Sequence, residues 1–322
     1  MVRMIQSKKE LLDKIMKMYK EDPLMASVVD VKCHFMVFVT VKDANPNGDP
    51  GDNGLPRTNA SMHGLILNVC LRRHIRDWFY RHGFAILGVT EDELREMDGE
   101  PKSISEVAKP SLSKISSEKE FVTKACSTFN DVRMFGYPFT FLTKKNGFAI
   151  DNGALKVTGP ITMTNAKSVS QVNISSYGLT RSANTTTSDK KTSDRMGEQN
   201  TVDFGLYVFT GAINAYEAKR TGLTNGDVEL FKQAVLNMFE NCESESGRGS
   251  GNITVEEMIF WKHDCADGQY CNADVFDTVT VKLKDGVSDP SSFSDYEITI
   301  NELPGLTPEV LTSRYSAANV AV

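Results

Sequence analysis

Residues 33–41, CHFMVFVTV, are rich in β-branched and aromatic side chains, which is typical of an extended strand. Alternate side chains of a strand point to opposite faces, and here both sets are apolar: Phe35, Val37, Val39 and Val41 on one face, Met36 and Phe38 on the other. A strand that is apolar on both faces is buried on both. The pattern therefore predicts a central strand of a sheet.

The stretch that follows, VKDANPNGDPGDNGLPR at residues 41–57, holds three each of Gly, Pro, Asn and Asp in seventeen positions. These are the residues of tight turns. Carboxylates at Asp43, Asp49 and Asp52 are of a kind that binds Mg²⁺ or Ca²⁺, but their spacing fits no EF-hand loop. The stretch also lacks the GxxxxGK[ST] and GxGxxG patterns of nucleotide sites. A structured turn is therefore favoured over a metal or nucleotide site.

Residues 61–83, SMHGLILNVCLRRHIRDWFYRHG, have apolar side chains at helical spacing. The apolar stripe consists of Leu67, Leu71, Ile75, Trp78 and Phe79, and the opposite face carries Asn68, Arg72 and Arg76. With Arg57 at the end of the turn and Arg73 on the helix, four guanidinium groups fall within twenty residues. Beside the backbone N–H groups of a Gly-rich turn they form a candidate phosphate track. A solvated helix face explains the same pattern equally well.

Between residues 177 and 203 the sequence loses its apolar periodicity and becomes rich in Ser, Thr, Asn and Lys, which predicts a long projecting loop or hairpin. It carries Arg181, Lys190, Lys191 and Arg195, followed by Met196. A cationic arm with an apolar residue suits a nucleic-acid backbone and the space between two bases. A plain surface loop is the alternative that composition alone favours.

The remaining segments indicate an α+β fold. An amphipathic helix is expected over residues 5–20, ended by Pro23, within an N-terminal segment 1–32. We expect residues 33–322 to form one domain with an insertion over about 85–130, strands in VRMFGYPFTFL and LKVTGPITMTNAKSV, and a helix capped by Thr224 and Asp227. This order favours an antiparallel sheet of the RNA-recognition or ferredoxin-like type with helices on one face.

The overall composition is that of an ordinary globular protein, with 40% hydrophobic and 24% charged residues. The net charge of -6 argues against nucleic-acid binding only if the 36 basic residues are spread evenly. No apolar run is long enough to span a bilayer and no signal peptide is evident, so we expect a cytoplasmic protein without membrane contact. His263, Asp264, Cys265 and Cys271 match no zinc motif, and no metal or other cofactor is expected.

The sequence of motifs is similar to that of a known family. NPNGDP at 45–50, a turn into LPR and the helical LRRHIRDW resemble the backbone subunit of type I CRISPR Cascade complexes, the Csd-two and Csh-two (I-C/I-B-like) branch of the Cas-seven family. Further matches follow in the same order: DVRMFG at 131–136, TGPITMTNAKSV at 158–169, YGLTR at 177–181, DRMGEQNTVDFGLY at 194–207, LNMFEN at 236–241 and IFWKHD at 259–264. The resemblance covers roughly residues 33–265.

The resemblance implies a modified RNA-recognition fold shaped like a hand, with residues 85–130 as fingers and 177–203 as a thumb. Copies would stack head to tail along a CRISPR guide RNA, together with a guide-processing subunit, a large subunit and a small subunit, and the guide would pair with a target DNA strand. A recruited helicase-nuclease is a further implied partner. By position in the motifs, the implied RNA-binding residues are Asn45, Asn47, Arg57, Asn68, Arg72, Arg73, Arg76, Arg133, Met163, Arg181, Lys190, Lys191, Arg195 and Met196. Met163 and Met196 are the candidates for contacts that stack on bases or separate them.

Three functions remain open at this point. The leading one is a non-catalytic RNA-binding scaffold, because pairing reads the target and the protein reads only the shape of the guide. The main alternative is a metal-dependent endoribonuclease that cuts guide-complementary RNA, as in type III relatives that use an aspartate in a palm loop, with Asp43, Asp49 and Asp52 as candidates. The third is a general single-strand binder outside any CRISPR complex.

Overall fold

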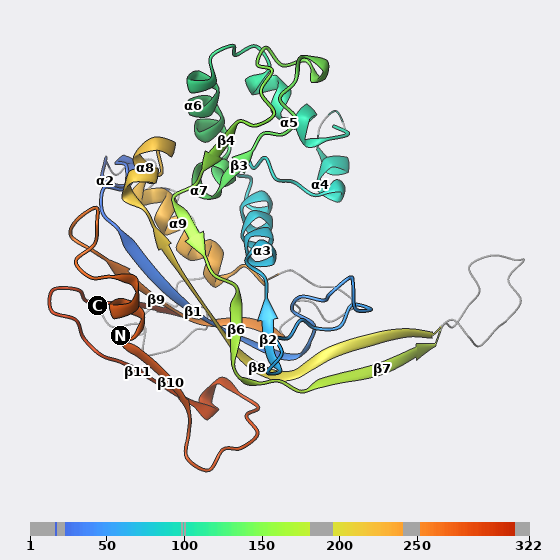
Figure 1. Cartoon of the computed structure of the whole chain (residues 1–322), viewed down its shortest axis with the longest axis vertical. Coiled ribbons are helices and arrows are strands. Elements are labelled where there is room, and N and C mark those ends of the chain that lie inside the picture. Colours follow the sequence, from blue (N-terminus) through green and yellow to red (C-terminus); the bar gives the residue numbers. More distant parts are fainter. Residues whose placement is uncertain are drawn as a thin grey trace, which may run out of the picture.

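The chain is built around an antiparallel sheet (Figure 1). The computed structural model describes residues 17, 23–97, 99, 101–180, 196–240 and 252–312. Along the main path of the sheet the strands are β12 (Glu309–Thr312), β9 (Ile253–Lys262), β1 (Cys33–Ala44), β8 (Met196–Ile213), β6 (Ala166–Gln171) and β2 (His63–Ile66). Two further strands, β5 (Ile161–Met163) and β7 (Ile174–Thr180), also pair with β8. The predicted α+β class with an antiparallel sheet is confirmed.

Strand β1 lies between β8 and β9, as its sequence predicts for a central strand. Its two apolar faces enter different hydrophobic clusters. Phe35, Val37, Val39 and Val41 belong to the main core, and Met36 and Phe38 belong to a second cluster on the other side of the sheet. The alternation in CHFMVFVTV thus assigns each side chain to its face.

Helices cover the face of the sheet that Phe35 occupies. α3 (Asn68–Arg81) buries Leu71, Ile75, Trp78 and Phe79 against it, which confirms the predicted apolar stripe. α9 (Asn225–Leu236) begins at the predicted capping box, in which Thr224 and Asp227 each accept a backbone N–H. α8 (Ala215–Thr221) precedes it, and α2 (Pro23–Ala26) packs on it. Pro23 begins α2, because proline is tolerated in the first turn of a helix.

The opposite face of the sheet is covered as well. α10 (Asn272–Phe276), β10 (Val279–Leu283), a 3₁₀ turn at Phe293–Asp295 and β11 (Tyr296–Ile300) follow β9, and β10 pairs with β11. Val275 and Tyr296 from this segment pack against Met36 and Phe38. The expectation of helices on one face is therefore incomplete, because the chain after residue 265 buries the second apolar face of β1.

The segment between α3 and β5 forms a helical unit at the top of Figure 1. It consists of α4 (Glu91–Glu96), α5 (Ile104–Leu112), α6 (Glu118–Thr128), α7 (Asn130–Phe135), β3 (Gly136–Pro138), a 3₁₀ turn at Lys144–Asn146 and β4 (Lys156–Thr158). Leu112, Phe121 and Phe139 centre a hydrophobic cluster of its own. The predicted strand in VRMFGYPFTFL is wrong for its first residues, because Val132–Phe135 belong to α7. Val132 packs in the cluster of the helical unit, and Met134 and Phe135 pack in the main core.

β7 and the first part of β8 form a two-stranded arm that projects from the sheet (Figure 1). Their register runs from Ile174 opposite Val202 to Thr180 opposite Met196. Residues 181–195 lie outside the described residues. The expected helix over residues 5–20 also lies outside them, apart from Lys17, which is helical and exposed. No helix within the described ranges is long and apolar enough to cross a membrane.

Candidate nucleic-acid interface

The Gly-rich turn after β1 is held together by its own side chains. Asn45 Nδ2 donates to the Gly54 carbonyl at 2.7 Å, and Arg57 Nη1 pairs with Asp49 Oδ2 at 2.8 Å. The other oxygen of Asp49 accepts the N–H of Gly51 at 2.9 Å. The predicted RNA contacts of Asn45 and Arg57 therefore compete with contacts inside the turn.

The glycines of this turn have an internal reason. A Cβ on Gly48 would lie 2.8 Å from the Gly54 carbonyl oxygen, closer than such atoms approach in proteins, and Gly54 has a positive φ of +75°. Both glycines therefore allow the two sides of the turn to meet. Asp49 is occupied by Arg57 and Gly51 N–H. Within the described parts of the chain, no three His, Cys, Asp or Glu side chains are grouped closely enough to hold a metal ion.

Three of the sequence motifs meet at the N-terminus of α3. Asn47 Oδ1 accepts the N–H of Leu67 at 3.0 Å, and Asn165 Oδ1 accepts the N–H of Asn68 at 2.8 Å. Asn68 Nδ2 in turn donates to the Met163 carbonyl at 3.2 Å. Asparagine side chains thus cap backbone N–H groups that a helix leaves unpaired at its start. Asn47 and Asn68, both predicted to bind RNA, position the helix that carries the arginines.

The arginines of α3 fall into two classes. Arg73 donates to Asp77 at 2.6 Å and to both oxygens of Glu93 at 3.3 Å, and it also contacts the Gly88 carbonyl. Arg76 Nε pairs at 3.0 Å with Asp131, whose side chain is fully buried. Both charges are therefore neutralised by carboxylates within the chain.

Arg72 differs from these two. Its guanidinium lies 5.5 Å from the centre of the Phe135 ring, which Arg76 also faces at 5.5 Å. Its Nε is buried without a hydrogen-bond partner, and no carboxylate in the described part of the chain pairs with it. Burial, followed by repulsion from Arg76, lowers the pKa of Arg72. A half-buried cation without a counter-charge is costly, and a phosphate oxygen would supply that charge.

Arg133 and Met163 require a correction. Arg133 is 8% exposed and donates to both oxygens of Asp227, at 2.8 and 2.7 Å, so its guanidinium is directed into the fold. Met163 is 6% exposed and belongs to the main core. A base cannot stack on Met163 without unpacking that core. Neither side chain is available to RNA in this arrangement, because the Arg133 guanidinium is paired with Asp227 and the Met163 side chain is packed in the core.

The remaining predicted residues belong to the segment that follows β7 in the sequence. Arg181, Lys190, Lys191 and Arg195 are outside the described residues, and the backbone of Met196 is the first of β8. The exposed side chain of Tyr177 lies on the projecting arm. RNA contacts of this region remain predictions.

Two residues of the site were missed from the sequence. Asn165 caps α3, and Phe135 supports both Arg72 and Arg76. Each lies inside a motif already noted, TGPITMTNAKSV or DVRMFG. Their motif positions were a usable signal. Phe135, however, lies 63 residues from Arg72 in the sequence, and Asn165 lies 97 residues from Asn68, separations that periodicity cannot indicate.

Of the four residues compared with zinc ligands, His263 belongs to a chain of hydrogen bonds with His34. Gln269 N–H donates to His263 Nδ1 at 2.9 Å, and His263 Nε2 lies 2.8 Å from His34 Nδ1. His34 Nε2 lies 2.9 Å from Asn272 Oδ1, which also accepts from Lys32 Nζ at 3.0 Å. Because Gln269 must donate, each imidazole is neutral and passes one N–H along the chain. Burial lowers the pKa of His34 to about 4 and also lowers that of His263.

Comparison with known proteins finds several similar chains. A protein "CRISPR-associated protein Cas7" of Haloferax volcanii is 25% identical over 245 residues, which are 71% of this chain and 69% of that protein. A chain of a "CRISPR RNA-guided surveillance complex, pre-nicking" has a TM-score of 0.48 and 14% identity, over 80% of this chain and 84% of its own. A chain of a second "CRISPR RNA-guided surveillance complex" has a TM-score of 0.46 and 14% identity, over 80% and 78%.

The match to a family model is more extensive. The model described as "CRISPR-associated protein Cas7" matches residues 31–301, which include β1, the Gly-rich turn, α3, the helical unit and the projecting arm. Because this range covers most of the 322 residues, the chain belongs to the Cas7 family of CRISPR-associated proteins.

Proposed function

We propose that this Cas7 protein binds a CRISPR guide RNA as the backbone subunit of an RNA-guided surveillance complex. Family membership supports the assignment, and Arg72 is the observation that carries it within the molecule. Arg72 lies on α3, half-buried, and no carboxylate among the residues that the structure describes pairs with it. Such a guanidinium group loses little side-chain conformational entropy when it binds a phosphate.

Binding through phosphates explains how one surface accepts any guide. Phosphate contacts position a nucleic acid without reading its sequence. A single arginine per copy is a modest contact, and copies that bind side by side along one RNA sum such contacts. The net charge of -6 is compatible with this function, because only the face toward the RNA needs to be basic.

The finer assignments follow the motifs of the sequence. We assign the chain to the Csd-two and Csh-two branch, in a type I-C or I-B Cascade, where copies stack head to tail. Its partners would be the guide RNA, the guide-processing, large and small subunits, the target DNA strand that pairs with the guide, and a recruited helicase-nuclease. Its place of action would be the cytoplasm.

We assign no catalytic step to the chain. Asp49, the central acid of the Gly-rich turn, forms an ion pair with Arg57 and caps the N–H of Gly51. A carboxylate engaged in this way is not poised to bind Mg²⁺. Asp43 and Asp52 are exposed, so these two carboxylates of the turn are the candidate metal ligands if the chain is a nuclease.

One experiment tests both the binding and the absence of catalysis. The purified protein is incubated with a guide RNA, then with complementary RNA and Mg²⁺, and both the bound and the intact RNA are quantified. We expect a stable ribonucleoprotein and intact complementary RNA. Cleavage at regular spacing that is lost in Asp43→Ala or Asp52→Ala would establish the nuclease. Equal affinity for a guide RNA that carries repeat-derived ends and for random RNA of the same length would favour a general single-strand binder.

A further inference from the structure

Besides its side-chain contacts, the Gly-rich turn has a frame of backbone hydrogen bonds. Asp49 N–H donates to the Leu55 carbonyl and Gly54 N–H donates to the Asp49 carbonyl, both at 2.8 Å. Arg57 N–H donates to the Asn47 carbonyl at 3.3 Å. This frame is independent of the ion pair between the Arg57 and Asp49 side chains, so the pair can open while the turn keeps its shape.

The Arg57–Asp49 pair is incomplete and partly open to water. The two side chains are 25% and 37% exposed, and Asp49 Oδ2 accepts from Nη1 of the guanidinium at 2.8 Å. Arg57 Nε is buried without a hydrogen-bond partner among the described residues, and so is the side-chain oxygen of Asn45, a residue that is 7% exposed. A buried polar atom without a partner is costly. The closed turn therefore leaves hydrogen-bonding capacity unused.

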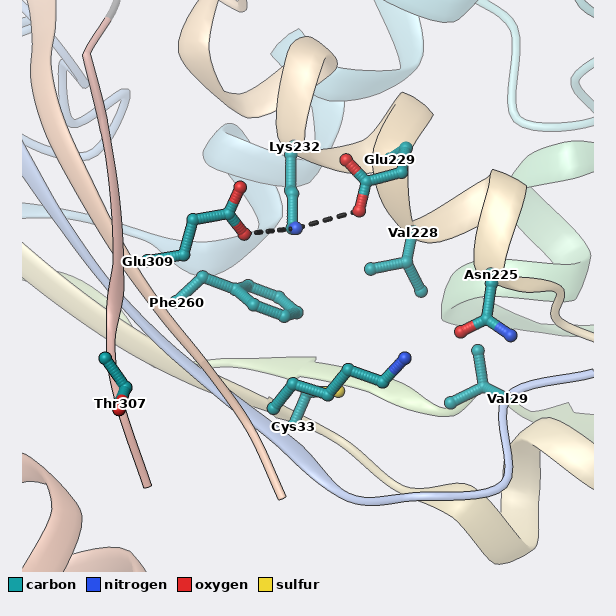
Figure 2. Close-up of a pocket in the computed structure, with 10 residues that line it drawn as sticks. Val29, Cys33, Asn225, Val228, Glu229, Lys232, Phe260, Thr307 and Glu309 are labelled. Atoms are coloured by element: carbon teal, nitrogen blue, oxygen red, sulfur yellow. Dashed lines mark hydrogen bonds and ion pairs between the residues drawn. The ribbon is translucent and has the colours of Figure 1, made fainter. Parts of the chain in front are cut away.

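Lys232 is a paired cation of the opposite kind (Figure 2). It is buried, and its Nζ lies 2.8 Å from Glu229 on α9 and 2.6 Å from Glu309 on β12. Exchange of either carboxylate there would leave a buried charge without its partner, which is strongly unfavourable. Arg57 and Asp49 meet no such barrier, because water reaches both side chains. An ion pair that is exposed in this way contributes little to stability and is readily replaced.

Arg57 lies beside the start of α3. Asn47 joins the two, because its carbonyl accepts the N–H of Arg57 at 3.3 Å and its Oδ1 accepts the N–H of Leu67, the residue before the helix, at 3.0 Å. Arg72, the proposed phosphate ligand, lies in the second turn of the same helix. The Gly-rich turn is thereby fixed to the helix that carries Arg72.

We propose that Asp49 is an internal competitor of the RNA: its carboxylate pairs with Arg57 in the free protein, and a phosphodiester group of the RNA replaces it in the complex. A phosphate accepts from two nitrogens of a guanidinium at once, so the exchange gives Arg57 Nε the partner that it lacks. Asp49 stays in the turn, because its Oδ1 keeps the N–H of Gly51 at 2.9 Å. This inference rests on the proposed function, because it takes RNA as the ligand.

The exchange makes Arg57 a weaker ligand than Arg72. Arg72 has no carboxylate of the described chain to lose, whereas Arg57 contributes only the difference between a phosphate and Asp49. The competition therefore lowers the affinity of a single copy for RNA. Copies that bind along one RNA each add this smaller contribution, so the contact still counts in an assembly.

Two variants of the pair test the exchange. Asp49→Asn removes the charge and keeps the Oδ1 that accepts the N–H of Gly51, and Arg57→Gln removes the cation. Asp92→Asn is the matched control, because Asp92 belongs to another exposed pair, with Arg95 on α4 at 2.9 Å. Affinity for a guide RNA with repeat-derived ends is measured by fluorescence anisotropy at several NaCl concentrations, with EDTA present so that no divalent metal binds the carboxylates.

Asp49→Asn should raise the affinity about threefold, the contribution of an exposed ion pair, and Asp92→Asn should not change it. Arg57→Gln should lower the affinity about fivefold and the slope of log K against log salt by about 0.7. Added to Arg57→Gln, Asp49→Asn should have no effect, because the carboxylate acts only through Arg57. Thermal unfolding verifies that each protein is folded. Arg57→Lys, which keeps the charge without the planar fork, replaces Arg57→Gln if that variant unfolds.

An unchanged affinity in Asp49→Asn would overturn the exchange. So would an equal rise with and without Arg57, because Asp49 would then act on RNA only through charge repulsion. Wild-type affinity and slope in Arg57→Gln would overturn it too, and would leave the proposed function with Arg72 intact. If the wild type binds no guide RNA, the proposed function fails; binding by Asp49→Asn would then still establish the competition, and no binding by that variant would overturn both.

Discussion

Arg133 and Asp227 lie 94 residues apart in the sequence and form a buried ion pair with two hydrogen bonds, 2.8 and 2.7 Å long. The pair joins α7 of the helical unit to the start of α9 on the sheet. Asp227 also accepts the N–H of Thr224 at 2.9 Å, so one carboxylate both caps α9 and holds the arginine. Arg133, the arginine in DVRMFG, therefore links the helical unit to the helix α9.

Removing one partner of this pair should destabilise the protein strongly. Arg133→Met leaves the buried charge of Asp227 uncompensated, and we expect the free energy of unfolding to fall by about 3–5 kcal/mol. The double variant Arg133→Met with Asp227→Asn should recover part of that loss, because the uncompensated charge is gone. Urea titration followed by circular dichroism measures both. A loss below about 1 kcal/mol in the single variant would show that the pair contributes little.

Stability should also depend on pH through His34. Burial lowers the pKa of His34 to about 4 in the folded chain, whereas an unfolded histidine titrates near its ordinary value of 6.5. Between these values the unfolded chain binds the extra proton, so stability is complete above pH 6.5 and is lost as the pH falls toward 4. The slope from one histidine is at most about 1.4 kcal/mol per pH unit.

The measurement is the free energy of unfolding at several pH values between 4 and 7.5. The variant His34→Gln keeps a polar side chain and removes this titration, so its slope in the window should be smaller than that of the wild type. His263 shifts in the same direction and should account for part of the slope that remains. Identical slopes in the two proteins would exclude His34 as a source of acid sensitivity.

Tyr207 offers a test of packing beneath β2. Its side chain is fully buried, and its hydroxyl has no hydrogen-bond partner in the described structure. Burial raises its pKa, which keeps the hydroxyl neutral. Because a buried hydroxyl without a partner is costly, Tyr207→Phe should raise the free energy of unfolding by about 1 kcal/mol.

Gly64 provides the counterpart, since a Cβ there would overlap the Tyr207 hydroxyl. Gly64→Ala should therefore destabilise the wild type more than it destabilises the Tyr207→Phe protein, which a double-mutant cycle of thermal unfolding can measure. Equal losses in the two backgrounds would mean that the hydroxyl is not the group in the way.

Local features of the fold were predictable because their cause is local. The alternation of Phe35 and Met36 places them on opposite faces of β1, and the spacing of Thr224 and Asp227 begins α9. The helix α7 was missed, because three of the four residues in VRMF are apolar and so short a run does not distinguish a helix from a strand.

The site was predictable only in outline. Sequence spacing places Arg72, Arg73 and Arg76 near one another on α3, but their carboxylate partners decide which charge is left for a ligand. Asp131, the partner of Arg76, lies 55 residues further along the chain. Such a distant pairing leaves no periodic signal, so Arg72 could not be distinguished from its neighbours before the fold was known.

The salt dependence of RNA binding tests the central claim most directly. Affinity for a single-stranded guide RNA is measured at several NaCl concentrations for the wild type, for Arg72→Gln and for the control Arg220→Gln, whose side chain is 75% exposed on α8 and pairs with Glu217. Each phosphate contact on a single strand contributes about 0.7 to the slope of log K against log salt. We predict that Arg72→Gln lowers the slope by about 0.7 per copy and the affinity by about tenfold, independently of guide sequence, whereas Arg220→Gln changes neither. A wild-type slope and affinity in Arg72→Gln would contradict the assignment of α3 as the phosphate-binding helix.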